Sequence, residues 1–94
     1  MLFSVFTLDN PNAADKRKSV HGEHVEHLKK AKDYGVIITV GGPLLSDDGT
    51  SAIGSLMVLE APDRASAEKF NRADPFHRNG IWGKVEIRRF DRKE

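Results

Sequence analysis

The chain has 94 residues, no cysteine and a formal net charge of +1, because 15 basic residues are interspersed with 14 acidic ones. This length predicts one domain over residues 1–94. The missing cysteines exclude disulfides and thiolate chemistry, and the balanced charge argues against nucleic acid and anionic membrane surfaces as partners. No run of about 18 apolar residues could span a bilayer, and the N-terminus lacks the basic segment of a signal peptide. We therefore expect a soluble, cytoplasmic protein.

The first half of the chain predicts a strand, a helix and a second strand. Residues 2–8 alternate along the chain in the way that a strand requires. A helix is expected from about residue 17 to residue 34, ending at Gly35, because glycine favours the conformation that follows a helix end. A β-branched run over residues 36–40 predicts the second strand, which we expect to end at the two glycines and the proline of residues 41–43.

The second half of the chain predicts a strand, a helix and a last strand. Residues 52–60 follow a polar turn and form the third strand pattern. A helix follows up to residue 74, with Asp63 as its N-cap and with Pro75 blocking its continuation. Residues 84–90 then predict the fourth strand.

This order, β-α-β-β-α-β, predicts a ferredoxin-like α+β fold with both helices on one face of a four-stranded antiparallel sheet. The strands nevertheless carry apolar side chains on both faces, as Phe3 and Val5 against Phe6 and Leu8 illustrate. Two helices can cover only one face, and an uncovered apolar face usually marks an interface. We therefore expect a homodimer that forms through the sheet face.

Three histidines on the first helix raise the question of where their rings point. At about 100° per residue, His24 lies roughly −40° and His21 roughly +20° from Leu28, inside the apolar stripe of the helix. A polar ring in that stripe faces either the sheet or a cavity above it. The alternative is a buried histidine whose ring is satisfied by a neighbouring carbonyl. Together with His27 the rings spread over about 120° of helix, which a single metal ion would bridge poorly, so no metal site is expected.

Asp74 precedes Pro75 directly after the second helix, and two interpretations are open for it. An aspartate before a proline is a good N-cap for a new short turn. The other interpretation is that its carboxylate faces a residue across a pocket, for which the histidines of the first helix are the candidates.

The stretches "KRKSVHGEHVEHL", "VGGPL" and "ADPFHRNGIWGKVEIRRF" resemble the YCII-related proteins of the dimeric α+β barrel superfamily, over essentially the whole chain. Members of this family pair a histidine of the first helix with the aspartate of the Asp-Pro-aromatic motif in a candidate active site. By position, the resemblance assigns these roles to His24 and Asp74. Many relatives have an arginine three residues before the histidine, where this chain has His21, and Arg17 matches an upstream basic position.

The resemblance also implies a range of chemistries. One branch of the family resembles a dehydrochlorinase acting on a chlorinated hydroxyhydroquinone, and the superfamily contains muconolactone isomerases, cofactor-free monooxygenases and haem enzymes. Because one fold carries unrelated chemistries, the site must decide among them.

A pair of His24 and Asp74 suits proton transfer on a small molecule, because imidazole is a general base near neutral pH and a carboxylate on one ring nitrogen fixes the tautomer. No nucleophile motif accompanies it. The expected enzyme is thus a cofactor-free lyase, such as a dehydrochlorinase, or an isomerase, acting on an aromatic or lactone-type substrate. We expect a pocket between the first helix and the sheet, walled by Phe3 or Val5, Phe76 and Trp82, with an anionic group held at its mouth by His21 and Arg17. The alternative is a non-catalytic dimeric module that binds a small-molecule ligand, in which His24 and Asp74 are structural.

Overall fold

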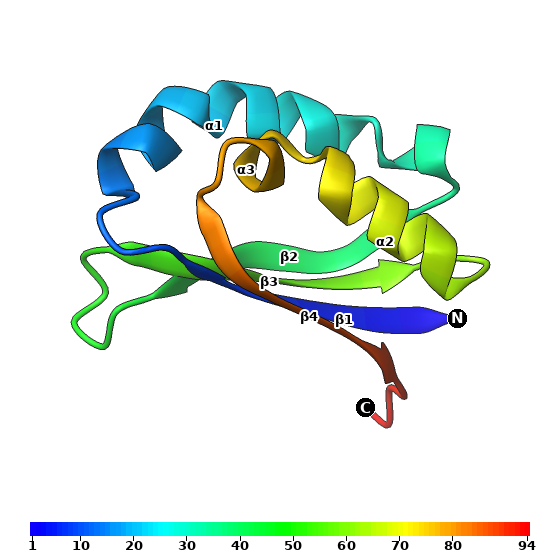
Figure 1. The fold of residues 1–94 in the computed structure, drawn as a ribbon. Helices are drawn as coiled ribbons and strands as arrows, with labels where there is room; N and C mark the ends of the chain where they lie inside the picture. The colour runs from blue at the N-terminus through cyan, green and yellow to red at the C-terminus, as the bar shows by residue number, and fades with distance from the viewer.

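The computed structural model describes residues 1–94 and shows one layer of helices on one face of a four-stranded sheet (Figure 1). In chain order the elements are β1 (Leu2–Asp9), α1 (Ala14–Lys29), the 3₁₀ turn η1 (Ala31–Tyr34), β2 (Ile37–Leu45), β3 (Ala52–Glu60), α2 (Arg64–Ala73), the short α3 (Pro75–Arg78) and β4 (Trp82–Phe90). The strand order is β2-β3-β1-β4, and all neighbouring strands are antiparallel. The predicted ferredoxin-like α+β fold is confirmed.

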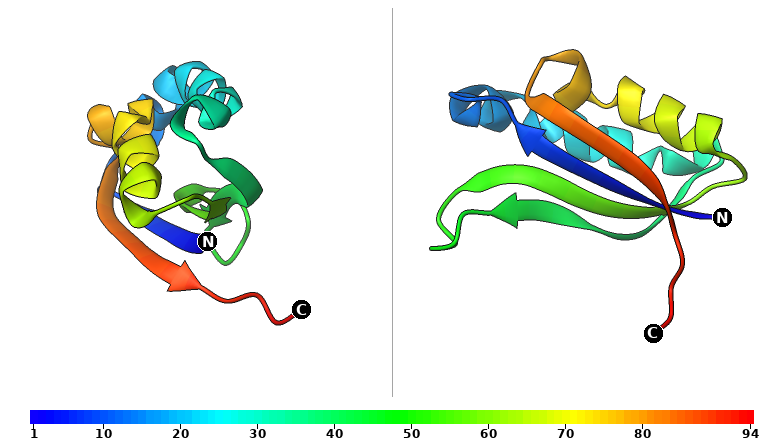
Figure 2. Two further views of the ribbon diagram at one scale, coloured as in Figure 1. Left: turned by 90° about the vertical axis from the view of Figure 1, so that its right-hand side faces the viewer. Right: turned by 60° about the horizontal axis from the view of Figure 1, so that its bottom comes forward.

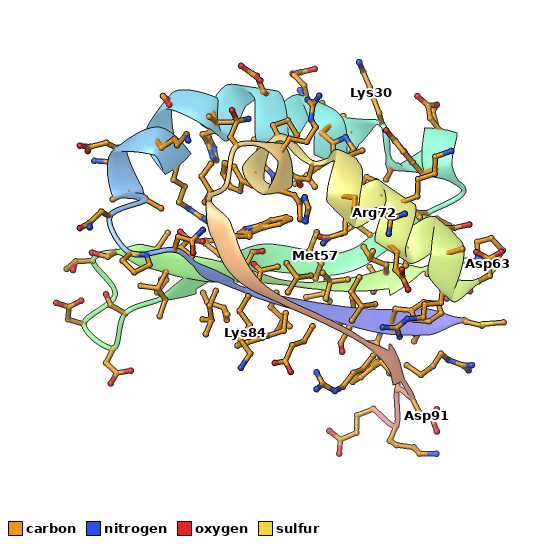
Figure 3. The ribbon with its side chains drawn as sticks, in the orientation of Figure 1. Lys30, Met57, Asp63, Arg72, Lys84 and Asp91 are labelled. Atoms are coloured by element: carbon orange, nitrogen blue, oxygen red, sulfur yellow. The ribbon has the colours of Figure 1, made fainter.

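The core lies between the helices and the sheet, and strand alternation places it there. On β1, Phe3 and Val5 are buried under the helices, and they pair with Leu59 and Met57 of β3 on the same face. Figure 3 shows Met57 between the two layers, whereas Lys84 of β4 projects from the opposite face of the sheet. The helical layer contributes Phe70 and other buried apolar side chains to the same cluster. Burial on one side of each strand therefore follows the period of two that the sequence shows.

The first helix is shorter than predicted and begins earlier. α1 starts at Ala14, where the backbone N–H of Arg17 already donates to the carbonyl of Ala13 at 2.8 Å. At the other end of α1, the N–H of Lys30 donates to the carbonyl of His27 at 3.0 Å. This bond spans three residues, as in a 3₁₀-helix, instead of four, and the α-helix ends there. The chain then continues as η1 and stops at Gly35, whose φ of 72° is left-handed as expected. The prediction of one helix up to residue 34 was wrong because hydrophobic periodicity cannot distinguish an α-helix from a following 3₁₀ turn.

The second strand is longer than predicted. It continues through the two glycines and Pro43 to Leu45, which pairs with Ala52. β2 lies at the edge of the sheet. An edge strand tolerates a proline because the N–H that proline lacks can be one that would have pointed to solvent. Gly41 sits in a tightly packed position, because a Cβ there would lie 3.2 Å from Ile38 Cγ2 and 3.3 Å from Met57 Cγ. The "GGP" stretch is therefore part of the sheet rather than its end.

The second helix begins and ends as predicted. The carboxylate of Asp63 accepts a hydrogen bond from the N–H of Ser66 at 2.8 Å. At the other end Asp74 is extended, with Pro75 opening the single turn α3 behind it. α3 packs against both α1 and α2, so it closes the helical layer in the middle (Figure 1).

The opposite face of the sheet is not covered by any helix (Figure 2). Cross-strand pairing places Ile37, Val40, Leu56 and Phe90 on this face, and all four side chains are exposed. No helix of the protein combines the length and the apolar character needed to cross a bilayer.

Candidate active site

His24 and Asp74 lie in direct contact, although fifty residues separate them in the sequence. Nδ1 of His24 lies 2.8 Å from both carboxylate oxygens of Asp74. The Asp74 side chain is 1% exposed and that of His24 is 12% exposed, so the contact is largely shielded from water. An ionised carboxylate can only accept hydrogen bonds, so the neutral imidazole carries its proton on Nδ1 and leaves a lone pair on Nε2.

The Nε2 atom of His24 has no partner within the chain. It is not one of the two buried polar atoms that lack a partner, which are Asn71 Oδ1 and Trp82 Nε1. Because His24 lines a cavity, its Nε2 is left open to whatever enters that cavity. A neutral imidazole with an open nitrogen can accept a proton from a bound molecule.

Aromatic rings fix the orientation of the His24 imidazole. The ring of Phe76 is stacked on it, with centroids 3.9 Å apart and planes inclined by 4°. Trp82 meets the two rings edge-on, with centroid distances of 6.3 Å to His24 and 5.9 Å to Phe76. Stacked and edge-to-face contacts of this kind hold a ring in one orientation. Phe76 lines the cavity, as expected, and also packs against the imidazole.

Arg17 lies two helical turns before His24 and is engaged with other groups. Its Nη1 donates to the carboxylate of Asp9 at 3.1 and 3.2 Å, and its Nη2 donates to the carbonyl of Gly54 at 3.1 Å. The guanidinium also lies over the Phe76 ring, 4.7 Å from its centroid. Burial raises the pKa of Asp9, and the charge and hydrogen bond of Arg17 offset this only in part. Arg17 therefore lines the cavity, but its positive charge is paired with the carboxylate of Asp9.

The other two histidines of α1 have different surroundings. His21 is exposed, makes no hydrogen bond to a protein group and lines the cavity, with its ring centroid 6.3 Å from that of His24. His27 donates from Nε2 to the carbonyl of Phe70 at 2.8 Å and is stacked on the Phe70 ring. The alternative of a histidine satisfied by a carbonyl thus describes His27 and not His24. No three or more histidines, aspartates or glutamates gather into a group that could hold a metal ion.

The cavity has a volume of about 370 Å³ and lies between α1 and the half of the sheet formed by β2 and β3. Val25 and Leu28 of α1 face Ile38 and Met57 of the sheet across it, and Ser55 of β3 also lines it. The expectation that Phe3, Val5 and Trp82 form its walls was wrong.

These three residues are packed into the core, because the cavity lies over β2 and β3 rather than over β1 and β4. Strand order decides this, and the sequence pattern alone does not give the side of the sheet on which a cavity forms. Ser55 was missed, although a serine on the same face as Met57 and Leu59 was a visible signal.

Comparison with known proteins places the chain among small α+β proteins. The family model of the YCII-related domain matches residues 1–91. An uncharacterized protein of Haemophilus influenzae is 26% identical over 94 residues, and protein YciI of Escherichia coli is 27% identical over 94 residues. Each match covers 96% of this chain and 96% of the relative.

Two solved structures share the fold. The 5-chloro-2-hydroxyhydroquinone dehydrochlorinase from Burkholderia phenoliruptrix AC1100, in complex with 2,5-dihydroxybenzoquinone, has a TM-score of 0.85 and 27% sequence identity to this chain. The match covers 97% of this chain and 94% of that one. An antibiotic biosynthesis monooxygenase matches over 100% of both chains with a TM-score of 0.57, and at 17% identity this likeness shows the fold alone.

Proposed function

The chain belongs to the YCII-related domain family, and on that premise we propose that it is a small-molecule enzyme in which His24 acts as the general base. The observation that carries the proposal is the buried Asp74 carboxylate on Nδ1, which leaves Nε2 of the same ring open to the cavity. A cofactor-free proton transfer is the chemistry that these groups supply without further help. General acid–base catalysis of this kind contributes typically about 10²–10⁴-fold to a rate.

The proposed step moves one proton. A C–H or O–H bond of the bound substrate breaks, its proton goes to Nε2 of His24, and its electron pair stays on the substrate. Asp74 keeps the other proton on Nδ1 and stabilises the imidazolium that results. In a dehydrochlorinase-like reaction the electron pair then expels chloride, whereas in an isomerisation the imidazolium returns the proton to another atom.

The cavity and its neighbours suggest the substrate class. Its apolar walls suit a ring, and the dehydrochlorinase of 27% identity was solved with a quinone bound. His21 at the cavity mouth, beside Arg17, is positioned to orient an anionic group of the substrate. We therefore propose an aromatic or lactone-type substrate that carries acidic hydrogens.

Turnover of a panel of chlorinated hydroquinones and lactones by the wild type and by His24→Ala tests the proposal. We expect His24→Ala to lose about 10²–10⁴-fold in kcat. The matched control is His27→Gln on the same helix, which should lower stability but leave kcat within about threefold. Wild-type turnover that survives His24→Ala would contradict the general-base role. Binding of these compounds by the wild type without any turnover would favour the non-catalytic ligand-binding module.

We further propose that two copies of the chain associate through the uncovered face of the sheet. Cross-strand rows on this face place Val40 beside Val58, and Leu56 beside Phe6. The part of the same face that β4 forms is charged, and there Arg88 Nη2 lies 2.7 Å from Glu86 Oε2. A two-fold axis through the apolar part would bury it against its own copy, as isologous interfaces do.

A further inference from the structure

Two hydroxyl groups meet on the otherwise apolar inner face of the sheet. Thr7 of β1 and Ser55 of β3 are directly opposite each other and are 0% and 5% exposed. Their side-chain oxygens lie 2.7 Å apart, and the backbone N–H of Ser55 donates to Thr7 Oγ1 at 3.0 Å. Thr7 is packed below, whereas Ser55 lines the cavity that His24 also lines. The pair therefore presents one polar group to that cavity from the sheet side.

Either hydroxyl can donate to the other across this contact. If Thr7 donates to Ser55 Oγ, its proton forms a bond of 2.7 Å, the usual length for two hydroxyls. If Ser55 donates instead, the Thr7 proton is left with the carbonyl of Ser55 at 3.4 Å, which is too long for a good O–H···O bond. The second arrangement gives each hydroxyl proton an acceptor within the chain, whereas the first leaves the Ser55 proton without one. The first arrangement therefore becomes favourable when a ligand oxygen in the cavity accepts the Ser55 proton.

The position of Ser55 is fixed from two sides. The preceding residue is Gly54, where a Cβ would collide with the carbonyl oxygen of Thr7, so only glycine allows β3 to approach β1 this closely. The carbonyl of Gly54 also accepts from Arg17, and this ties the segment to α1. A hydroxyl held in this way loses little conformational freedom when it binds a ligand.

We infer that Ser55 positions the substrate by donating its hydroxyl proton to a substrate oxygen while Nε2 of His24 faces the acidic hydrogen. The inference rests on the proposed function and narrows its substrate class to ring compounds with two oxygens, one of which is a hydrogen-bond acceptor. As the proton leaves for Nε2, the electron pair shifts through the ring toward the oxygen bound to Ser55. The Ser55 proton is shared in this step and is not transferred.

Binding of two probes to Ser55→Ala tests the inference. The probes are 2,5-dihydroxybenzoquinone, which offers several acceptor oxygens, and phenol, which offers one oxygen for both sites. We expect Ser55→Ala to weaken the quinone about tenfold and phenol less than twofold, because only the quinone loses a hydrogen bond. Ser51→Ala is the matched control, since the exposed Ser51 lies outside the cavity, and it should leave both affinities unchanged.

A second variant keeps the test valid if Ser55→Ala folds poorly. Thr7→Val combined with Ser55→Ala replaces both hydroxyls by apolar groups, so neither hydroxyl is left without its partner, and only the backbone N–H of Ser55 loses an acceptor. This double variant should show the same selective loss of the quinone.

The outcomes separate the inference from the proposed function. The inference would be overturned if Ser55→Ala bound both probes as tightly as the wild type does, or if it lost the same affinity for both. The hydroxyls of Thr7 and Ser55 would then only link β1 to β3. A wild type that binds neither probe would overturn the inference and the aromatic substrate class together. A selective loss in Ser55→Ala combined with full turnover by His24→Ala would uphold the role of Ser55 and overturn the general base.

Discussion

At the scale of the residue, Asp74 serves two purposes that looked like alternatives. Its Oδ1 accepts from the backbone N–H of Phe76 at 2.8 Å, which makes it the N-cap of α3. The same carboxylate accepts from Nδ1 of His24 through both oxygens. A carboxylate has about four lone-pair sites, so both bonds form at once. The hydrogen bond from the Phe76 N–H thus fixes the Asp74 carboxylate, and this carboxylate in turn orients the His24 ring.

Asp74→Asn separates these two purposes. Asparagine is as good an N-cap as aspartate, so we expect the free energy of unfolding to change by about 1 kcal/mol or less. Its oxygen must still serve Phe76, which turns its NH₂ group toward His24. The imidazole then has to move its proton from Nδ1 to Nε2, and the base is lost.

Nitrogen-15 NMR of the neutral histidines checks this directly. The wild type should show His24 protonated on Nδ1 and the variant should show it protonated on Nε2, with turnover reduced about 10²-fold or more. An unchanged tautomer would mean that Asp74 does not set the protonation of the ring.

Asp63 gives a prediction on pH at the same scale. Its hydrogen bond from the N–H of Ser66 lowers its pKa below the usual value of 3.8. A carboxylate with a lowered pKa in the folded state stabilises the fold above the unfolded pKa and loses this contribution as the pH falls through the folded pKa. Asp63→Asn keeps the cap without the charge. The difference between the melting temperatures of the two proteins should therefore be full at pH 7 and change as the pH falls below 3.8 and through the folded pKa of Asp63, whereas a gap that is constant with pH would contradict the prediction.

At the scale of the element, the sequence predicted the strands and helices better than their ends. Residues 52–60 form β3 as expected, because their apolar run is bounded by turn residues on both sides. The end of α1 and the length of β2 were missed, since both depend on contacts between elements. His24 and Asp74 could be found as candidates because one lies in an apolar stripe and the other beside a proline. Ser55 could have been noticed as a serine on an apolar strand face, but its pairing with Thr7 depends on the register between β1 and β3.

Gly54→Ala tests how closely β3 must approach β1. The added Cβ would collide with the backbone oxygen of Thr7, and backbone cannot move aside as a flexible side chain can. We expect a loss of about 1–3 kcal/mol in urea unfolding, together with weaker quinone binding because Ser55 is displaced. Gly42→Ala is the control, since a Cβ there meets nothing within 4 Å. It should change stability by less than about 1 kcal/mol, and equal effects of the two substitutions would refute the close-approach argument.

At the scale of the whole molecule, the sheet separates two surfaces with different purposes. The cavity lies on its helical face, whereas the exposed apolar side chains lie on the other face. A chain of this size buries only roughly 60–65% of its unfolded surface, so covering the second face would add considerably to its stability. Association of two copies should therefore stabilise the fold without completing the cavity.

Val40→Lys tests the association and its independence from the cavity. Val40 is 59% exposed on the uncovered face, and a lysine there would place two like charges in a two-fold interface. We expect light scattering to give twice the chain mass of 10.5 kDa for the wild type and the single mass for the variant at micromolar concentration. Lys30→Glu on the opposite, helical side is the control and should remain dimeric. The monomeric variant should melt at a lower temperature yet bind 2,5-dihydroxybenzoquinone as the wild type does, because no cavity residue is changed. A wild type at 10.5 kDa would refute the dimer, and a dimeric Val40→Lys would place the interface elsewhere.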